Sequence, residues 1–305
     1  MTRRAHIFAK CLLTAAITAA LAGCGGSAAE NLSGASFTAA SELPAAATYD
    51  GSAATGQNGA LIDTSHVAEG YVAVSVEASS RIKLLVSLGD STQSYDVPTD
   101  GDPIIAPLTF GNGAYTFRIM QNTSGNNYVE LARAQADVEL VDEFAPYVRP
   151  NVYCDYDEDS ACVSRARELV ADAANQAEAL SAICDYIVEN VSYDEDKASE
   201  LSDSTGYTPD PDETLTSGTG ICFDYASLGA AMLRSQGIPT QIVTGTVTPD
   251  NIYHAWLMVY IDGTWTSANF DVEAKTWSRV DLTFAAGGAT NLVGDGKTYT
   301  PRYVY

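Results

Sequence analysis

The chain has 305 residues, of which 46% are hydrophobic, and its formal net charge at pH 7 is −23. This length and hydrophobic content suffice for one large or two ordinary folded domains, which excludes a wholly disordered chain. The negative charge disfavours binding to nucleic acid or anionic polymers, so no nucleic-acid partner is expected, but it identifies no substrate.

A short apolar segment lies near the N-terminus. Basic residues precede an apolar run at residues 11–21, which is too short to span a bilayer and predicts a signal peptide at residues 1–23. The tetrapeptide Leu-Ala-Gly-Cys that ends at Cys24 resembles the lipobox of bacterial lipoproteins; the alternative is an ordinary secretory signal. The resemblance implies lipidation of Cys24, export, and attachment to the outer face of the bacterial cell membrane by the lipid alone.

Two segments of different composition follow. Residues 24–60 are rich in Ala, Ser, Gly and Thr without periodicity, which predicts a flexible tether. Residues 61–145 contain short alternating or β-branched runs separated by turn signals, and they predict a small, sandwich-like β domain. The domain shows no catalytic cluster, and His66 is interpreted as a surface residue.

The second domain is predicted at residues 146–305, after a boundary marked by two prolines. Apolar residues at helical spacing predict helices at 165–174 and 177–191, and Cys184 in the second helix is interpreted as a core residue. The polar stretch 192–217 is predicted to be a surface loop because it contains proline and turn-forming residues.

Cys154 and Cys162 bracket an acidic loop. They either form a disulfide or remain free, because sequence separation does not define the geometry of the sulfurs. Aspartates at alternate positions resemble the start of a calcium loop, but Ser160 and Ala166 stand where glycine and glutamate are required. We therefore predict a polar loop with Ser160 at a helix N-cap.

A candidate nucleophile, Cys222, lies at the start of a predicted helix. The segment Gly-Thr-Gly-Ile-Cys222-Phe-Asp-Tyr-Ala continues into a helical pattern that Gly237 and Pro239 end. Helix N-termini favour the thiolate and offer backbone N–H groups to an oxyanion. Asp224 opposes the first effect, although an acidic residue suits this position.

The candidate base is His254, which lies in the strand-like run Tyr-His-Ala-Trp-Leu-Met-Val-Tyr. On a strand, His254, Trp256 and Met258 share one face. An imidazole at the edge of that face can meet a cysteine on a packed helix, with the tryptophan excluding water.

These motifs together resemble the transglutaminase-like superfamily: Gly-x-Cys-x-x-Tyr-Ala, then Leu-Arg-x-x-Gly-Ile-Pro, then His-Ala-Trp. The resemblance covers about residues 146–284. It implies an α+β, papain-like core in which a helix bearing the cysteine packs on an antiparallel sheet. It also implies that Cys222 is the nucleophile, His254 the general base, and an aspartate the third residue.

The third residue departs from the usual family spacing. Trp265 stands at the customary distance after the histidine, but the residue four positions later is Asn269. Trp277 is followed four positions later by Asp281 in Val-Asp-Leu-Thr. We therefore select Asp281, which requires an inserted hairpin near residues 269–275, and keep Asn269 as second choice because an amide also orients imidazole in thiol proteases.

The predicted chemistry is acyl transfer through a thioester, with water or an amine as acceptor. The expected substrate is an extracellular peptide, protein or peptidoglycan stem, inferred from the predicted location alone. No cofactor and no metal are expected, because the candidate residues lack metal-ligand spacing. The alternative is a catalytically inactive surface module that binds peptides or proteins on the same fold.

Overall fold

The computed structural model describes residues 31–202, 204–248, 251–267, 269–288 and 299–305. The predicted signal peptide, Cys24 and the first part of the predicted tether lie outside these residues. Within the described ranges, no helix is both long enough and apolar enough to cross a membrane.

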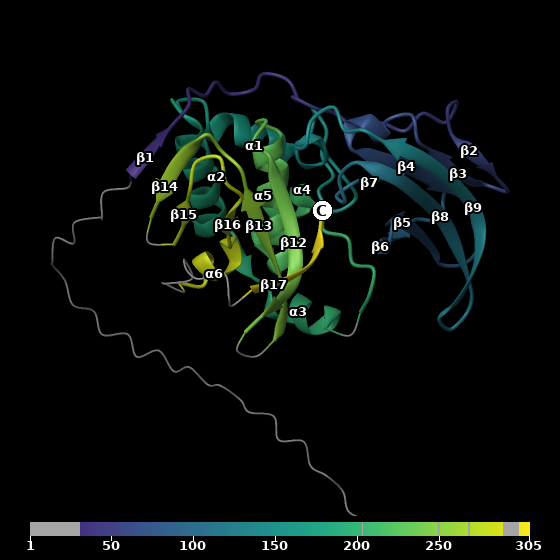
Figure 1. Ribbon diagram of the computed structural model, residues 1–305. Helices are drawn as coiled ribbons and strands as arrows, with labels where there is room; N and C mark the ends of the chain where they lie inside the picture. The colour runs from purple at the N-terminus through teal and green to yellow at the C-terminus, as the bar shows by residue number, and fades with distance from the viewer. Residues whose placement is uncertain (1–30, 203, 249–250, 268, 289–298) are drawn as a thin grey trace, which may run out of the picture.

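Two four-stranded antiparallel sheets form the first domain, with strand orders β2-β3-β4-β7 and β6-β5-β8-β9 (Figure 1). Alternate residues of β5, namely Ile82, Leu84 and Val86, are buried, as expected for a strand with one face on a core. The predicted sandwich-like domain is confirmed. The strands are β2 Thr55–Gln57, β3 Ala60–Asp63, β4 Tyr71–Val76, β5 Ile82–Leu88, β6 Ser91–Val97, β7 Ile104–Pro107, β8 Gly113–Ser124 and β9 Asn127–Val138.

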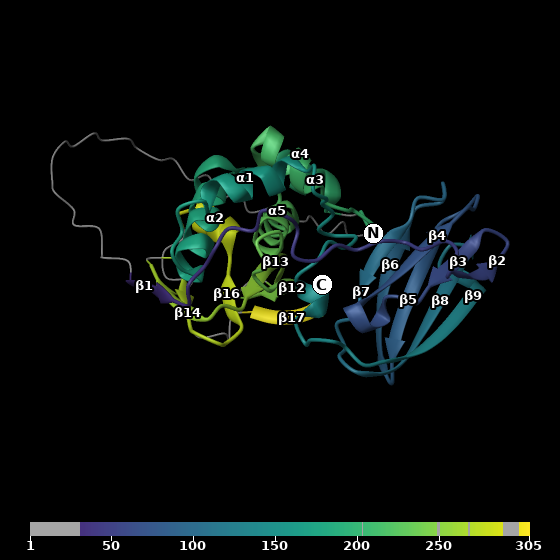
Figure 2. The same ribbon diagram turned by 90° about the horizontal axis from the view of Figure 1, so that it is seen from above.

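The second domain is α+β, as predicted. Its main sheet is antiparallel with the order β16-β13-β12-β17. Helices α1 to α5 lie on one side of this sheet, and α5 packs on β12 and β13 (Figure 2). The elements of this domain are α1 Ala161–Leu169, α2 Gln176–Asn190, β10 Ser192–Tyr193, α3 Glu195–Leu201, α4 Pro211–Ser217, β11 Thr219–Gly220, α5 Cys222–Arg234, β12 Thr240–Val247, β13 Ile252–Val259, β16 Ser278–Val280, α6 Leu282–Ala286 and β17 Tyr299–Val304.

The predicted flexible tether is wrong from residue 31 onward. Strand β1 (Asn31–Gly34) pairs with β14 (Gly263–Thr266), which in turn pairs with β15 (Asp271–Val272). Farther along, the Ala40 N–H donates to Gln236 Oε1 at 3.0 Å, and Arg167 Nε donates to the Ala40 carbonyl at 3.0 Å. Strand pairing uses backbone groups that every residue carries, so a composition without side-chain periodicity did not prevent it.

The predicted loop at 192–217 is also wrong, because it contains α3 and α4. The Asp194 carboxylate accepts from the N–H of Lys197, and the Asp210 carboxylate accepts from two N–H groups at the start of α4. Pro211 occupies the first turn of α4, where its missing N–H costs nothing. Prolines and aspartates that suggested a loop are therefore helix-start signals.

The two domains share a continuous hydrophobic core. Tyr95 of the sandwich is fully buried, with its ring 5.9 Å from that of Tyr153 and 6.1 Å from that of Tyr305. Gln93 Nε2 donates to the Val304 carbonyl at 3.2 Å. The sandwich is therefore packed directly against the domain that contains the candidate site.

Candidate active site

Cys222 is the first residue of α5 and is partly exposed, whereas the helix is buried from Asp224 onward. The first N–H groups of a helix have no partners within the helix, and the helix dipole favours an anion there. The position of Cys222 at the helix start favours a thiolate, and its partial exposure allows a substrate to reach it.

The charge of Asp224 is compensated in the structure. This carboxylate is completely buried and accepts hydrogen bonds from the Ile221 N–H at 2.8 Å and from the Tyr207 hydroxyl. Lys197 Nζ of α3 lies 2.9 Å from the same carboxylate. The opposition to a thiolate expected from Asp224 is therefore reduced, and the aspartate fixes the turn that presents Cys222.

Gly220 is needed where the chain enters α5. A Cβ atom at this position would lie 2.6 Å from Cβ of Asp224, closer than real Cβ atoms approach. The glycine in the Gly-x-Cys motif therefore has a steric cause: the buried aspartate occupies the space that a side chain would need.

His254 lies on β13 and is 4% exposed. Its Nε2 donates to Asp281 Oδ2 at 2.8 Å, and the ring stacks on Phe284 with centroids 4.5 Å apart. Burial alone would lower the pKa of His254, but hydrogen bonds and charge interactions with Asp281 and Cys222 outweigh it and raise that pKa to about 9. Because Nε2 faces Asp281, Nδ1 is the nitrogen left for Cys222.

Asp281 directly follows β16 and caps α6. Its Oδ1 accepts from the Phe284 N–H at 3.1 Å, while Oδ2 accepts from His254 and, at 2.7 Å, from the hydroxyl of Tyr299. The carboxylate is 6% exposed. A buried carboxylate with three donors is held in one orientation, which it imposes on the imidazole.

Asn269 lies elsewhere, in the turn between β14 and β15. Its backbone N–H donates to Ser267 Oγ at 3.2 Å. The strands on either side of this turn form the extra hairpin that the choice of Asp281 required. The structure thus places Asp281, not Asn269, against His254.

Comparison with known proteins finds a family for the part of the chain that holds Cys222 and His254. Residues 163–270 match the family model of the transglutaminase-like superfamily. The chain contains a transglutaminase-like domain. A UPF0252 protein of Archaeoglobus fulgidus is 31% identical over 96 residues, which are 27% of this chain and 31% of that protein. The chain thus spans about a third of the length of this curated relative.

Three solved structures show distant likenesses. A candidate cysteine protease from Cytophaga hutchinsonii has 16% identity and a TM-score of 0.34, covering 77% of this chain and 86% of its own. LapG of Legionella pneumophila has 16% identity and a TM-score of 0.26, covering 41% and 61%. A candidate protease from Parabacteroides distasonis has 15% identity and a TM-score of 0.29, covering 69% and 44%.

Three residues around the transglutaminase-like site were missed in the sequence: Lys197, Tyr207 and Tyr299. Each is distant along the chain from the residue it contacts. Tyr299 belongs to the alternating run Tyr-Thr-Pro-Arg-Tyr-Val-Tyr, which signals a strand but not a partner. Lys197 and Tyr207 lie in the stretch predicted as a loop, so no local pattern connected them with Asp224.

The other cysteines within the described ranges are structural. Cys154, Cys162 and Cys184 are buried and free, so the first two do not form a disulfide. Burial raises the pKa of the Cys154 thiol to about 12 and raises those of the other two as well. These thiols are therefore poor nucleophiles.

His66 lies outside the transglutaminase-like domain. Its Nδ1 is 3.2 Å from Glu69 Oε1, and its ring stacks on Tyr71 with centroids 5.1 Å apart. These contacts explain the residue without a catalytic role.

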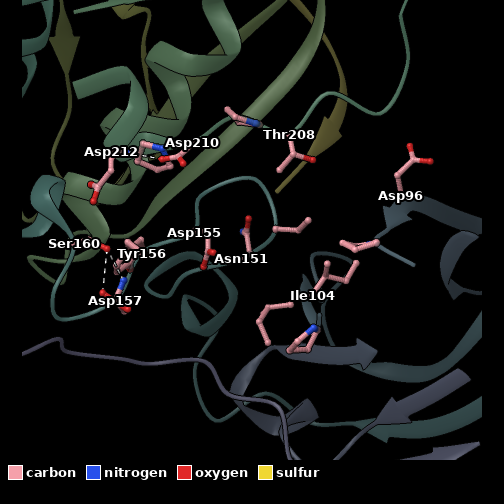
Figure 3. Close-up of a pocket in the computed structure, with 16 residues that line it drawn as sticks. Asp96, Ile104, Asn151, Asp155, Tyr156, Asp157, Ser160, Thr208, Asp210 and Asp212 are labelled. Atoms are coloured by element: carbon pink, nitrogen blue, oxygen red, sulfur yellow. Dashed lines mark hydrogen bonds between the residues drawn. The ribbon is translucent and has the colours of Figure 1, made fainter. Parts of the chain in front are cut away.

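A pocket of about 600 Å³ lies between the two domains, apart from Cys222, His254 and Asp281 (Figure 3). Most of its carboxylates have roles in the fold. Asp212 accepts from the first two N–H groups of α1 at 2.8 Å each, and Asp96 pairs with two basic residues of the sandwich. Within the described ranges, no three His, Cys, Asp or Glu side chains are grouped to hold a metal ion.

Proposed function

We propose that this protein is an exported lipoprotein whose transglutaminase-like domain catalyses acyl transfer or hydrolysis of amides at Cys222. The observation that supports the proposal is the 2.8 Å hydrogen bond between His254 and Asp281, together with the position of Cys222 at the start of α5, where it helps to raise the pKa of His254. Cys222 is the nucleophile, His254 is the general acid and base, and Asp281 is the carboxylate that orients the imidazole.

In the first half-reaction the Cys222 thiolate attacks the amide carbonyl carbon and a C–S bond forms. Backbone N–H groups at the start of α5 stabilise the oxyanion. The His254 imidazolium then donates its Nδ1 proton to the leaving nitrogen, the C–N bond breaks, and an amine or ammonia departs. The product on the enzyme is a thioester.

In the second half-reaction water or an amine attacks the thioester. The neutral imidazole of His254 removes a proton from the acceptor, the C–S bond breaks, and the thiolate is restored with an imidazolium beside it. Water gives a peptidase or amidase, and an amine gives a cross-linking acyltransferase. Extracellular peptides, proteins and peptidoglycan stems are the proposed substrates, because the proposed location brings them within reach.

The test is the rate at which iodoacetamide labels Cys222 between pH 5 and 8, followed by mass spectrometry. An unperturbed thiol is mostly protonated in this range. The burial of the other three described cysteines outside the site makes the native label selective. Cys222→Ala controls for the site of labelling, and His254→Ala removes the partner.

Rapid labelling at low pH that His254→Ala abolishes supports the proposal. Slow labelling that is insensitive to His254→Ala contradicts it and favours the inactive binding module on the same fold.

Lipid attachment is tested separately. The native chain should partition into detergent and carry the mass of a lipid on Cys24, whereas Cys24→Ala should keep its signal peptide and lack the lipid. A native chain without lipid at Cys24 would contradict this part of the proposal.

A further inference from the structure

Asp281 Oδ2 has two donors in the structure. His254 Nε2 lies at 2.8 Å and the Tyr299 hydroxyl at 2.7 Å from this one oxygen. A carboxylate oxygen accepts two hydrogen bonds, so the two donors do not exclude each other. The Tyr299 hydroxyl therefore donates to Asp281 Oδ2, the same oxygen that accepts from His254.

The ring of Tyr299 is held on two sides and is 7% exposed. The guanidinium carbon of Arg279 lies 3.9 Å from the ring centroid, and the Trp256 ring meets it edge-on with centroids 5.0 Å apart. Both neighbours come from strands that flank the site. A side chain with these contacts presents its hydroxyl in one direction.

The backbone at the start of β17 also places this tyrosine. The pairing of β12 and β17 shifts register between Thr244 and Gly245. A Cβ on Gly245 would lie 2.1 Å from the Thr300 carbonyl oxygen, so the glycine permits the close approach of β17. This approach brings Tyr299 across the sheet to Asp281, which follows β16 at the opposite edge.

We infer that Tyr299 is a positioning residue that holds the Asp281 carboxylate in place for His254. The inference rests on the proposed function. Burial and the neighbouring Asp281 charge raise the pKa of the Tyr299 hydroxyl, so it remains a neutral donor when the site is active. The neutral hydroxyl therefore holds the Asp281 carboxylate in place without neutralising its charge. A cation at the same position would neutralise that charge, which stabilises the His254 imidazolium.

The test variant is Tyr299→Phe, which removes one hydroxyl and keeps the ring. The matched control is Tyr253→Phe, because Tyr253 is half-exposed on β13 and its hydroxyl donates to Thr244 Oγ1 at 2.9 Å. The first readout is the pKa of His254, measured by NMR titration of the imidazole C–H signals in the full chain. This readout needs no substrate and no reactive thiol.

We expect Tyr299→Phe to lower the pKa of His254 by about one unit, because a carboxylate that has lost its second donor is held less firmly against the imidazolium and stabilises it less. Labelling of Cys222 at pH 6 should slow about tenfold, and Tyr253→Phe should change neither quantity. An unchanged or raised His254 pKa in Tyr299→Phe overturns the inference.

A double-mutant cycle separates positioning from general stability. In the Asp281→Asn background, Tyr299→Phe should slow labelling by less than about twofold, because a neutral amide has replaced the charged carboxylate through which the tyrosine acts. An undiminished tenfold effect in that background also overturns the inference. Slow labelling in the unmodified chain would instead contradict the proposed function, while the His254 titration would still decide the role of Tyr299.

Discussion

The starts of α5 and α6 each carry a buried aspartate with similar hydrogen-bond partners but a different cation: Asp224 lies in the first turn of α5, and Asp281 is the N-cap of α6. Each has a buried aspartate that accepts a nearby backbone N–H and a tyrosine hydroxyl. At α5 the cation beside Asp224 is Lys197, and at α6 the cation beside Asp281 is His254. A lysine keeps its proton during an acyl-transfer reaction, whereas a histidine can donate a proton and take one back.

The comparison shows how one arrangement serves two purposes. The pair of Asp224 and Lys197 holds the segment before Cys222 and joins α3 to α5. The pair of Asp281 and His254 lies where a proton must move to and from a substrate. We therefore expect changes at the first pair to affect mainly stability, and changes at the second to affect mainly reactivity.

The largest expected effect is that of replacing the two cations. His254→Ala should slow acyl transfer or Cys222 labelling by about 10²- to 10⁴-fold, the range for a lost general acid or base. Lys197→Ala should change the labelling rate only a few-fold in the molecules that remain folded. If both variants lost the same fraction of the labelling rate, the pair of Asp224 and Lys197 would not differ in role from the pair of Asp281 and His254.

The next effect compares the two candidates for the third residue. Asp281→Asn should slow labelling about 10²-fold, because an amide supplies no charge to stabilise the imidazolium. Asn269→Ala is the control and should leave the rate within about twofold. The reverse order of the two variants would show that the choice of Asp281 is wrong.

The stability of the α5 start provides the third prediction. Asp224→Asn leaves Lys197 without its counter-charge, and breaking a buried pair costs about 3 to 5 kcal/mol. We expect the lower end of that range, because the Lys197 side chain is 26% exposed and water screens it in part. Urea unfolding measures the free energy of unfolding, with Asp262→Asn as control for the exposed pair of Asp262 and Lys275.

A fourth prediction is a dependence of stability on pH. The pKa of His254 is raised to about 9 in the folded chain, above the ordinary value of about 6.5. Its ion pair therefore stabilises the fold fully below about pH 6.5, and this contribution is lost as the pH rises through about 9. The difference in unfolding free energy between the unmodified chain and His254→Ala should shrink over that interval, and a growing difference would contradict the assignment.

Local patterns in the sequence were sufficient for a large part of the fold. Alternating apolar residues in the first domain predicted the sandwich. Apolar residues at helical spacing around Cys184 and Cys222 predicted two of the main helices. The same patterns failed at residues 31–34, which form β1, and at α3 and α4. Strand β1 depends on a backbone partner far along the chain, and α3 and α4 depend on capping by aspartate. Neither feature leaves a periodic pattern of apolar residues in the sequence.

The sequence by itself determined the order of the candidate residues: a cysteine at a helix start, a histidine on a strand, and an aspartate after an inserted hairpin. Only the tertiary structure decided which groups surround them. Lys197 joins Asp224, and Tyr299 joins Asp281 across a four-stranded sheet. The physical reason is that spacing encodes the direction of a side chain within its own element, whereas a hydrogen bond between elements depends on how whole strands and helices pack.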